Sequence, residues 1–158
     1  MSFTGMGGYV FDGQTEVKHS KYTNTYSFLE ITVSHGVSPT NGGYFFVYLP
    51  SATDAETKAY SDSLDERITV ISQTDTVHAV RDNDIGVTGY VFYEAGSCNG
   101  VTVSAPCIVM VSEENGATTV SVSDPTHKLN SVTVSVNGTV LDFDVEGNVG
   151  NTFTKTVE

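Results

Sequence analysis

The sequence predicts an all-β protein, an antiparallel β-sandwich with one short helix, and three observations support this prediction. Apolar and polar residues alternate over several segments of the 158-residue chain, as they do in half-buried strands. Valine and threonine, which favour strands, are frequent. Turn-forming pairs such as Asp12-Gly13 and Asn137-Gly138 separate the apolar segments. The length suits one domain of ordinary size or two small ones.

The first fifty residues predict three strands separated by polar or turn-forming segments. In the middle strand, Leu29, Ile31 and Val33 lie on one face, opposite polar residues. A polar stretch that reaches residue 25 precedes this strand, and a loop rich in Gly, Pro and Asn follows it. The three strands and this loop are residues 8–11, 26–34, 44–49 and 35–43, respectively.

The third of these strands is apolar on both faces. One face carries Tyr44, Phe46 and Tyr48, and the other carries Phe45, Val47 and Leu49. Strands of this kind lie at the centre of a two-layer structure, or their outer face meets another domain.

One helix is expected, directly after Pro50 ends the third strand. Thr53 or Asp54 can cap its N-terminus and Glu56 lies in its first turn, so the helix extends to about Ser61. Three further strands follow, with a turn at Asp82-Asn83-Asp84 between the last two. They are residues 67–72, 76–81 and 87–93.

A domain boundary is expected at residues 94–97, where small residues follow an aromatic-rich segment. All eight tyrosines precede residue 94, whereas the later part is rich in Ser, Thr and Val. The two expected domains are residues 1–96 and 97–158.

The second part predicts two hairpins and an edge strand. Asn137-Gly138 is the favoured pair for a type I′ turn. Such a turn aligns three pairs on one apolar face, namely Val136 with Thr139, Val134 with Leu141 and Val132 with Phe143. The other hairpin joins residues 107–112 and 118–123, and residues 151–158 could add the edge strand.

The charge balance excludes several classes of partner. Nineteen acidic residues face seven basic ones, so the formal net charge is −12. A field of this sign repels nucleic acid, anionic lipid and anionic polysaccharide alike. The longest apolar run, residues 44–49, is too short to cross a bilayer. Residues 1–8 read like a cut inside a longer gene, so an export signal would lie upstream.

No pattern of metal or cofactor ligands stands out. The four histidines are spread over different segments without His-x-His or His-Glu-x-x-His spacing, so structural roles are expected for them. Residues 62–66 and 82–84 could offer oxygen ligands to calcium, but solvated turns explain both better. Cys98 and Cys107 leave two alternatives open, a local disulfide or two partly buried free thiols.

The order of several segments is similar to that of a known enzyme family. The segments that carry this similarity are residues 27–36, 43–50, 56–60, 68–71, 77–81, 85–89 and 117–126. From about residue 8 to about residue 136, the chain resembles the C-terminal half of polysaccharide lyase family 8. This family includes the hyaluronate, chondroitin AC and xanthan lyases.

The resemblance implies a place within a larger protein. Members of the family have an N-terminal α/α-toroid, a large central β-sandwich and a small C-terminal β-sandwich. Residues 1–96 then correspond to the last strands of the central sandwich, and residues 97–158 to the small domain. The family's catalytic residues lie in the toroid, so the resemblance assigns no catalytic residue here. The chain is expected to be a non-catalytic part of a secreted bacterial lyase, with that toroid as its partner.

Aromatic residues are the remaining candidates for contact with a polysaccharide, with Tyr44, Tyr48 and His35 foremost. Tyrosine rings can stack on sugars, but core packing or domain contact is the more usual role of large aromatic side chains. An independent carbohydrate-binding or cell-surface adhesion module is the alternative interpretation of the whole chain. The other tyrosines considered are Tyr9, Tyr22, Tyr26 and Tyr93.

Overall fold

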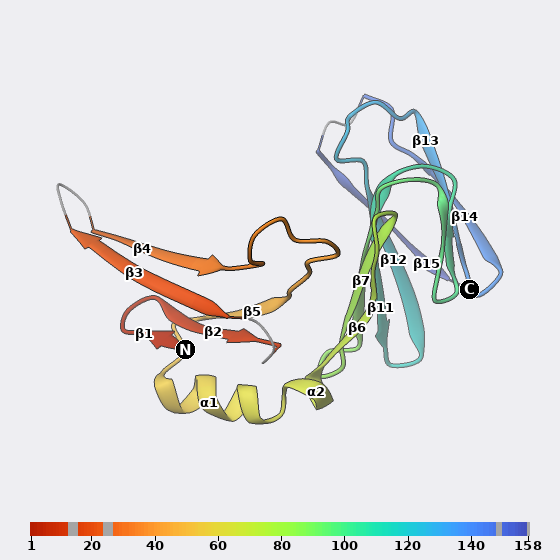
Figure 1. Ribbon diagram of the computed structural model, residues 1–158. Helices are drawn as coiled ribbons and strands as arrows, with labels where there is room; N and C mark the ends of the chain where they lie inside the picture. Colours follow the sequence, from red (N-terminus) through yellow and green to blue (C-terminus); the bar gives the residue numbers. More distant parts are fainter. Residues whose placement is uncertain (13–15, 24–26, 148–149, 158) are drawn as a thin grey trace. The chain divides into compact units, whose positions relative to one another are not determined.

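The computed structural model describes residues 1–12, 16–23, 27–147 and 150–157. It confirms the all-β prediction, because antiparallel strands dominate and two short helices accompany them (Figure 1). The chain divides into two compact units, Met1–Leu64 and Asp65–Glu158, which we call unit 1 and unit 2.

Unit 1 contains a three-stranded sheet, a two-stranded ribbon and a helix. The sheet has the order β1-β2-β5, and the ribbon pairs β3 with β4. Its elements are β1 (Ser2–Phe3), β2 (Gly7–Phe11), β3 (Val17–Thr23), β4 (Ser27–Val33), β5 (Phe46–Pro50) and α1 (Asp54–Asp62).

The ribbon corrects one prediction of the sequence. The polar stretch that was expected to carry no strand forms β3, which pairs with β4 from Val17 opposite Val33 to Thr23 opposite Ser27. Almost every residue of β3 is exposed, so its sequence lacks the alternating apolar face by which a strand is predicted. On β4 the expected face is present, since Leu29, Ile31 and Val33 are less exposed than their neighbours.

One face of the three-stranded sheet packs on α1. The register places Gly8 beside Leu49 and Val10 beside Val47, and these side chains share a face. A β-carbon on Gly8 would overlap the buried side chain of Thr57 in α1, so glycine permits this close approach. The two-faced strand β5 therefore lies at the edge of its sheet with one face turned to the helix.

The start of α1 is as predicted. Thr53 is the N-cap and forms a capping box, in which the Thr53 hydroxyl accepts from the Glu56 amide and the Glu56 carboxylate accepts from the Thr53 amide. A second helix, α2 (Leu64–Arg67), follows directly and was not predicted.

Unit 2 is a β-sandwich of two sheets. The six-stranded sheet has the order β15-β12-β11-β8-β7-β6, and the four-stranded sheet has the order β14-β13-β10-β9. The strands are β6 (Ile68–Gln73), β7 (Val77–Asp82), β8 (Val87–Phe92), β9 (Gly96–Cys98), β10 (Val101–Val103), β11 (Cys107–Glu114), β12 (Ala117–Ser123), β13 (Ser131–Val136), β14 (Thr139–Asp144) and β15 (Thr152–Val157).

The predicted hairpins of unit 2 are confirmed. The pair β13 and β14 has the expected register, with Val132 opposite Phe143 and Val134 opposite Leu141. Asn137 and Gly138 both have positive φ, as a type I′ turn requires. The pair β11 and β12 turns at Asn115 and Gly116 in the same way, and β15 is an edge strand beside β12.

The structure divides the chain at a different point from the expected boundary near Gly96. Strand β8 precedes that point and β11 follows it, yet the two pair from Val87 to Phe92 within one sheet. Residues 65–96 therefore share a hydrophobic core with the rest of unit 2. The division between the two units falls in the sequence between Leu64 and Asp65. The expected boundary rested on a change of composition after residue 93. The pairing of β8 with β11, which lie on either side of Gly96, decides instead that both belong to one domain.

Candidate binding site

The face of the unit 1 sheet opposite α1 is aromatic. Tyr9 of β2 lies opposite Tyr48 of β5, and Phe11 lies opposite Phe46. The ring centroids are 4.9 Å apart in the first pair and 5.7 Å in the second. Cross-strand pairing thus builds a continuous surface of rings from an alternating pattern in two strands.

A row of three rings follows β5 and the residues just before it. Tyr44, Phe46 and Tyr48 occupy alternate positions and are 41%, 48% and 45% exposed. The rings of Tyr44 and Phe46 are nearly parallel, at 10°, with centroids 6.4 Å apart. The Tyr48 hydroxyl donates a hydrogen bond of 2.7 Å to the Met6 carbonyl, which holds that ring in place. We call Tyr44, Phe46 and Tyr48 the aromatic row.

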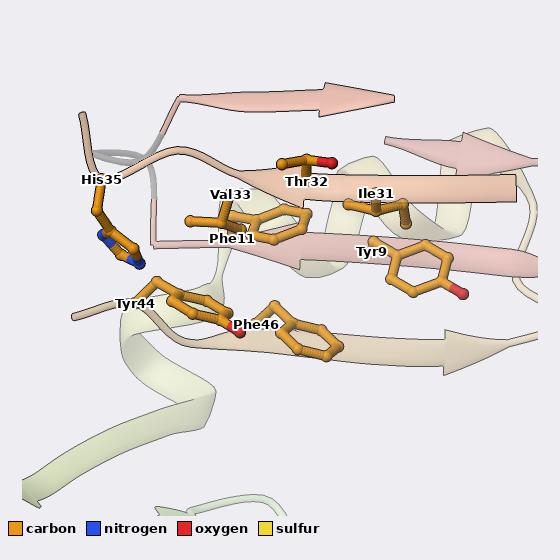
Figure 2. Close-up of a pocket in the computed structure, with 8 residues that line it drawn as sticks. All are labelled: Tyr9, Phe11, Ile31, Thr32, Val33, His35, Tyr44 and Phe46. Atoms are coloured by element: carbon orange, nitrogen blue, oxygen red, sulfur yellow. The ribbon is translucent and has the colours of Figure 1, made fainter. Parts of the chain in front are cut away.

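A pocket of about 410 Å³ lies between this surface and strand β4 (Figure 2). The close-up shows Ile31, Thr32 and Val33 of β4 along one side, with Tyr44 and Phe46 along the opposite side. The lining residues are Tyr9, Phe11, Ile31, Thr32, Val33, His35, Tyr44 and Phe46. None of them is Asp, Glu, Lys or Arg, so the pocket is lined by rings, aliphatic groups and a few neutral polar atoms.

Two of the three foremost candidates meet at one end of this pocket. The rings of His35 and Tyr44 are 5.6 Å apart, which brings together residues that the sequence places at the two ends of a loop. Gly42 lies against the His35 ring, where a β-carbon would be in tight contact. Tyr48 belongs to the aromatic row but does not line the pocket. Phe46, Phe11 and Ile31 line it although the sequence did not single them out as ligand contacts.

The remaining tyrosine candidates lie elsewhere. Tyr22 is exposed on β3, and Tyr26 lies outside the described residues. In unit 2, Tyr93 packs edge-on against His78, with ring centroids 5.3 Å apart and 3.4 Å between the tyrosine oxygen and His78 Nδ1. A second histidine–tyrosine pair therefore exists, on an exposed surface of unit 2.

The two cysteines are free thiols in the structure. Cys107 of β11 is fully buried in the sandwich core, and Cys98 of β9 is half-buried against the same core. Burial, reinforced by the negative charge of Asp124, raises the pKa of the Cys107 thiol to about 11. Cys107 is therefore a neutral, unreactive thiol at physiological pH.

The acidic turn at residues 82–84 serves the local fold. The Asp82 carboxylate accepts from the Asp84 amide, and the Asp84 carboxylate pairs with Arg67. Asn83 donates to the Glu66 carbonyl and the Thr69 hydroxyl. Over the described residues, no group of three or more His, Cys, Asp and Glu side chains is arranged to hold a metal ion.

Asp124 forms a polar centre that sequence reasoning did not identify. Its nearly buried carboxylate accepts hydrogen bonds from the amides of Thr126, Lys128 and Leu129 and from the Thr126 hydroxyl, at 2.7–2.9 Å. Desolvation raises the pKa of this carboxyl, but the four donors outweigh that effect and hold it well below its usual range. Every contact is local, so Asp124 shapes the connection between β12 and β13.

Comparison with known proteins relates the chain to polysaccharide-degrading enzymes. Residues 69–133 match the family model described as the polysaccharide lyase family 8, C-terminal beta-sandwich domain. A hyaluronate lyase from Thermasporomyces composti is 31% identical over 150 residues, which cover 84% of this chain and 19% of that enzyme. The chain thus spans about a fifth of the length of this relative. None of the helices in the described part of the chain is long and apolar enough to cross a membrane.

Solved structures show the same fold. A mutant of the chondroitin AC lyase from Streptomyces coelicolor A3 has a TM-score of 0.73 at 20% identity, covering 96% of this chain and 25% of that one. The xanthan lyase from Paenibacillus has a TM-score of 0.70 at 23% identity, covering 82% and 14%, respectively. Together with the match over residues 69–133 and the related hyaluronate lyase, this confirms the resemblance seen in the sequence: the chain is related to the C-terminal β-sandwich region of polysaccharide lyase family 8.

Proposed function

We propose that this chain is the non-catalytic C-terminal part of a secreted bacterial polysaccharide lyase. The observation that carries the proposal is the asymmetry of the alignment, which takes in 84% of this chain but only 19% of the related hyaluronate lyase. The pocket of unit 1 supports it as well, because its lining includes no Lys or Arg that could neutralise a substrate carboxylate. β-Elimination needs a base, an acid and a group that neutralises the substrate carboxylate.

The two units have different assignments in this proposal. Unit 2 is the family's C-terminal β-sandwich domain, in keeping with the match over residues 69–133. Unit 1 supplies the last strands of the preceding central sandwich, so the boundary lies between Leu64 and Asp65 rather than at residue 96. Both units support the catalytic toroid of the parent enzyme.

A lyase assay tests the proposal directly. The purified chain is incubated with hyaluronan, chondroitin and xanthan near neutral pH, and the absorbance of unsaturated uronate is followed. A complete family 8 lyase serves as the positive control. We expect no absorbance change with this chain; growth of the signal in a preparation free of contaminating lyase would overturn the proposal.

A second function, contact with the polysaccharide, is favoured by the aromatic row. Its three rings, 41–48% exposed along β5 and the residues just before it, form a surface that can stack on sugars. Titration of the chain with hyaluronan, chondroitin sulfate, xanthan and a neutral glucan, at low and physiological salt, tests this function. Saturable binding that is lost in Tyr44→Ala would support it, and absence of binding to all four would exclude it.

A further inference from the structure

We infer that the pocket of unit 1 is a stacking subsite for an uncharged sugar ring, which it contacts through the apolar C–H face of that ring. This inference rests on the second proposed function, contact with a polysaccharide, and specifies which type of sugar is held. Its main contacts are Phe46 and Tyr44, with Tyr9 and His35 beside them.

The arrangement of the rings supports stacking. Tyr44 and Phe46 come from alternate positions of one extended segment, so their rings point to the same side and lie within 10° of parallel. Tyr9 approaches Phe46 from β2 with a centroid distance of 6.3 Å. Neighbouring exposed rings on one side of the segment offer aromatic surface to a ligand, which suits the apolar C–H face of a pyranose.

The charges around the pocket decide between an uncharged sugar and a uronate. None of the lining residues is cationic, and the whole chain carries a net charge of −12. Lys18 lies opposite Thr32 in the β3–β4 ribbon, but its ammonium is 3.2 Å from the Glu16 carboxylate. A uronate carboxylate in this pocket would lose hydration without gaining a cationic partner, and that loss is unfavourable.

Neutral hydroxyl and amide groups face no such penalty. The Tyr9 hydroxyl and the His35 imidazole are neutral groups that can both donate and accept hydrogen bonds. An N-acetylhexosamine or a neutral hexose could therefore place its apolar face on the rings and its polar groups toward these atoms. The volume of about 410 Å³ is within the range of small-ligand sites.

The test compares two tetrasaccharides of equal ring number on the full 158-residue chain. The first is an uncharged N-acetylglucosamine tetramer, and the second is a hyaluronan tetrasaccharide, which carries two carboxylates. Binding is measured by calorimetry at low and physiological salt. We expect saturable binding of the uncharged tetramer, independent of salt, and weaker binding of the charged one.

Variants then locate the site. Phe46→Ala should weaken binding of the uncharged tetramer about tenfold, the effect of losing one ring contact, whereas Phe46→Tyr should retain binding within about twofold. Phe28→Ala is the matched control, because Phe28 is an exposed ring on β4 that does not line the pocket. Because Phe46 contacts the rings of Tyr9, Phe11 and Tyr44, circular dichroism and the melting temperature of each variant are measured to verify that it is folded.

Three results would overturn the inference: no saturable binding of the uncharged tetramer, tighter and salt-sensitive binding of the charged one, or equal affinity of wild type and Phe46→Ala. These failures are distinct from failure of the main proposal, because lyase activity is read separately from unsaturated-uronate absorbance.

Discussion

The two units of the molecule treat their large apolar side chains in opposite ways. Unit 2 buries a cluster of sixteen residues between its two sheets, whereas among the described residues of unit 1 only Val10 and Leu64 are buried hydrophobics. Three rings of unit 1, the aromatic row, remain 41–48% exposed along one segment. Unit 2 thus completes a core from its own residues, while unit 1 leaves several of its aromatic side chains exposed.

The cause of this difference is whether another sheet or a helix covers each apolar face of a strand. In strands such as β10 and β13 of unit 2, buried valines alternate with Ser and Thr, and the opposing sheet covers the valine face. Strand β5 is apolar on both faces, but α1 covers only one of them. The aromatic row is therefore a consequence of sequence pattern and limited coverage, and it is the part of the chain where binding should be sought.

The largest expected effect tests whether unit 2 depends on its closed core. Phe143 is the largest of the fully buried side chains. Phe143→Ala should lower the free energy of unfolding by about 3–5 kcal/mol, because both burial and packing contacts are lost. Urea denaturation followed by circular dichroism measures it. Val140→Ala on the same strand, where Val140 is exposed, should change the value by less than about 0.5 kcal/mol. Equal losses of stability in Phe143→Ala and Val140→Ala would contradict the burial of Phe143 in the core of unit 2.

Asp124 sharpens the comparison because it stabilises unit 2 through polar contacts. Asp124→Asn keeps one carbonyl oxygen but loses the charge and part of the four hydrogen bonds, so unfolding at pH 7 should become easier by about 2–3 kcal/mol.

The pH dependence of this difference has a definite sign. The pKa of Asp124 is lower in the folded chain than in the unfolded one, so its contribution is complete above about pH 4 and is lost at lower pH. Urea midpoints of wild type and Asp124→Asn should therefore converge below about pH 4. A gap that stays constant down to pH 2 would contradict the role of the ionised carboxylate.

Gly8→Ala tests the single covered face of unit 1. The added methyl group would overlap the Thr57 side chain, so β2 and α1 must separate, at a cost of about 1–3 kcal/mol. Amide hydrogen exchange should increase in β2 and α1. Gly89→Ala in unit 2 is the control, because no atom lies within 4 Å of the position that its β-carbon would take. Unchanged protection of α1 in Gly8→Ala would refute the close approach.

The smallest effect concerns the start of α1. Thr53→Ala removes the hydroxyl that caps the Glu56 amide and should cost about 1 kcal/mol of helix stability. Hydrogen exchange in residues 54–58 reports the loss, and Thr53→Ser, which keeps the hydroxyl, should behave like the wild type. If exchange in α1 were the same in both variants, tertiary packing rather than the cap would set the stability of this helix.

Several elements of the fold could be predicted because their determinants are local. The Asn137-Gly138 pair and the alternation of valines around it define the register of β13 and β14, with Val132 opposite Phe143. The cap of α1 depends on Thr53 and Glu56, three residues apart. Strand β3 could not be predicted, because its exposed residues show no apolar face and it exists through pairing with β4.

The candidate site was predictable only in part. Tyr44, Tyr48 and His35 were selected as candidates from the sequence, but their mutual placement depends on a loop that returns Tyr44 to the His35 ring. Tyr9 and Phe11 lie far from Phe46 along the chain. The register of β2 with β5 brings all three residues to the same surface. Phe46 had a signal in the alternation of aromatic residues, although that alternation does not reveal which face remains exposed.

The sequence alone determined the all-β class, the hairpins, the capped helix, the acidic balance and the resemblance to polysaccharide lyase family 8. These depend on composition and on residues close together in the chain. The tertiary structure decided that residues 65–96 join the sandwich of unit 2, that β15 pairs with β12, and that one aromatic face of unit 1 stays uncovered. Such outcomes follow from contacts between distant strands, and a periodic pattern specifies a buried face without specifying what will cover it.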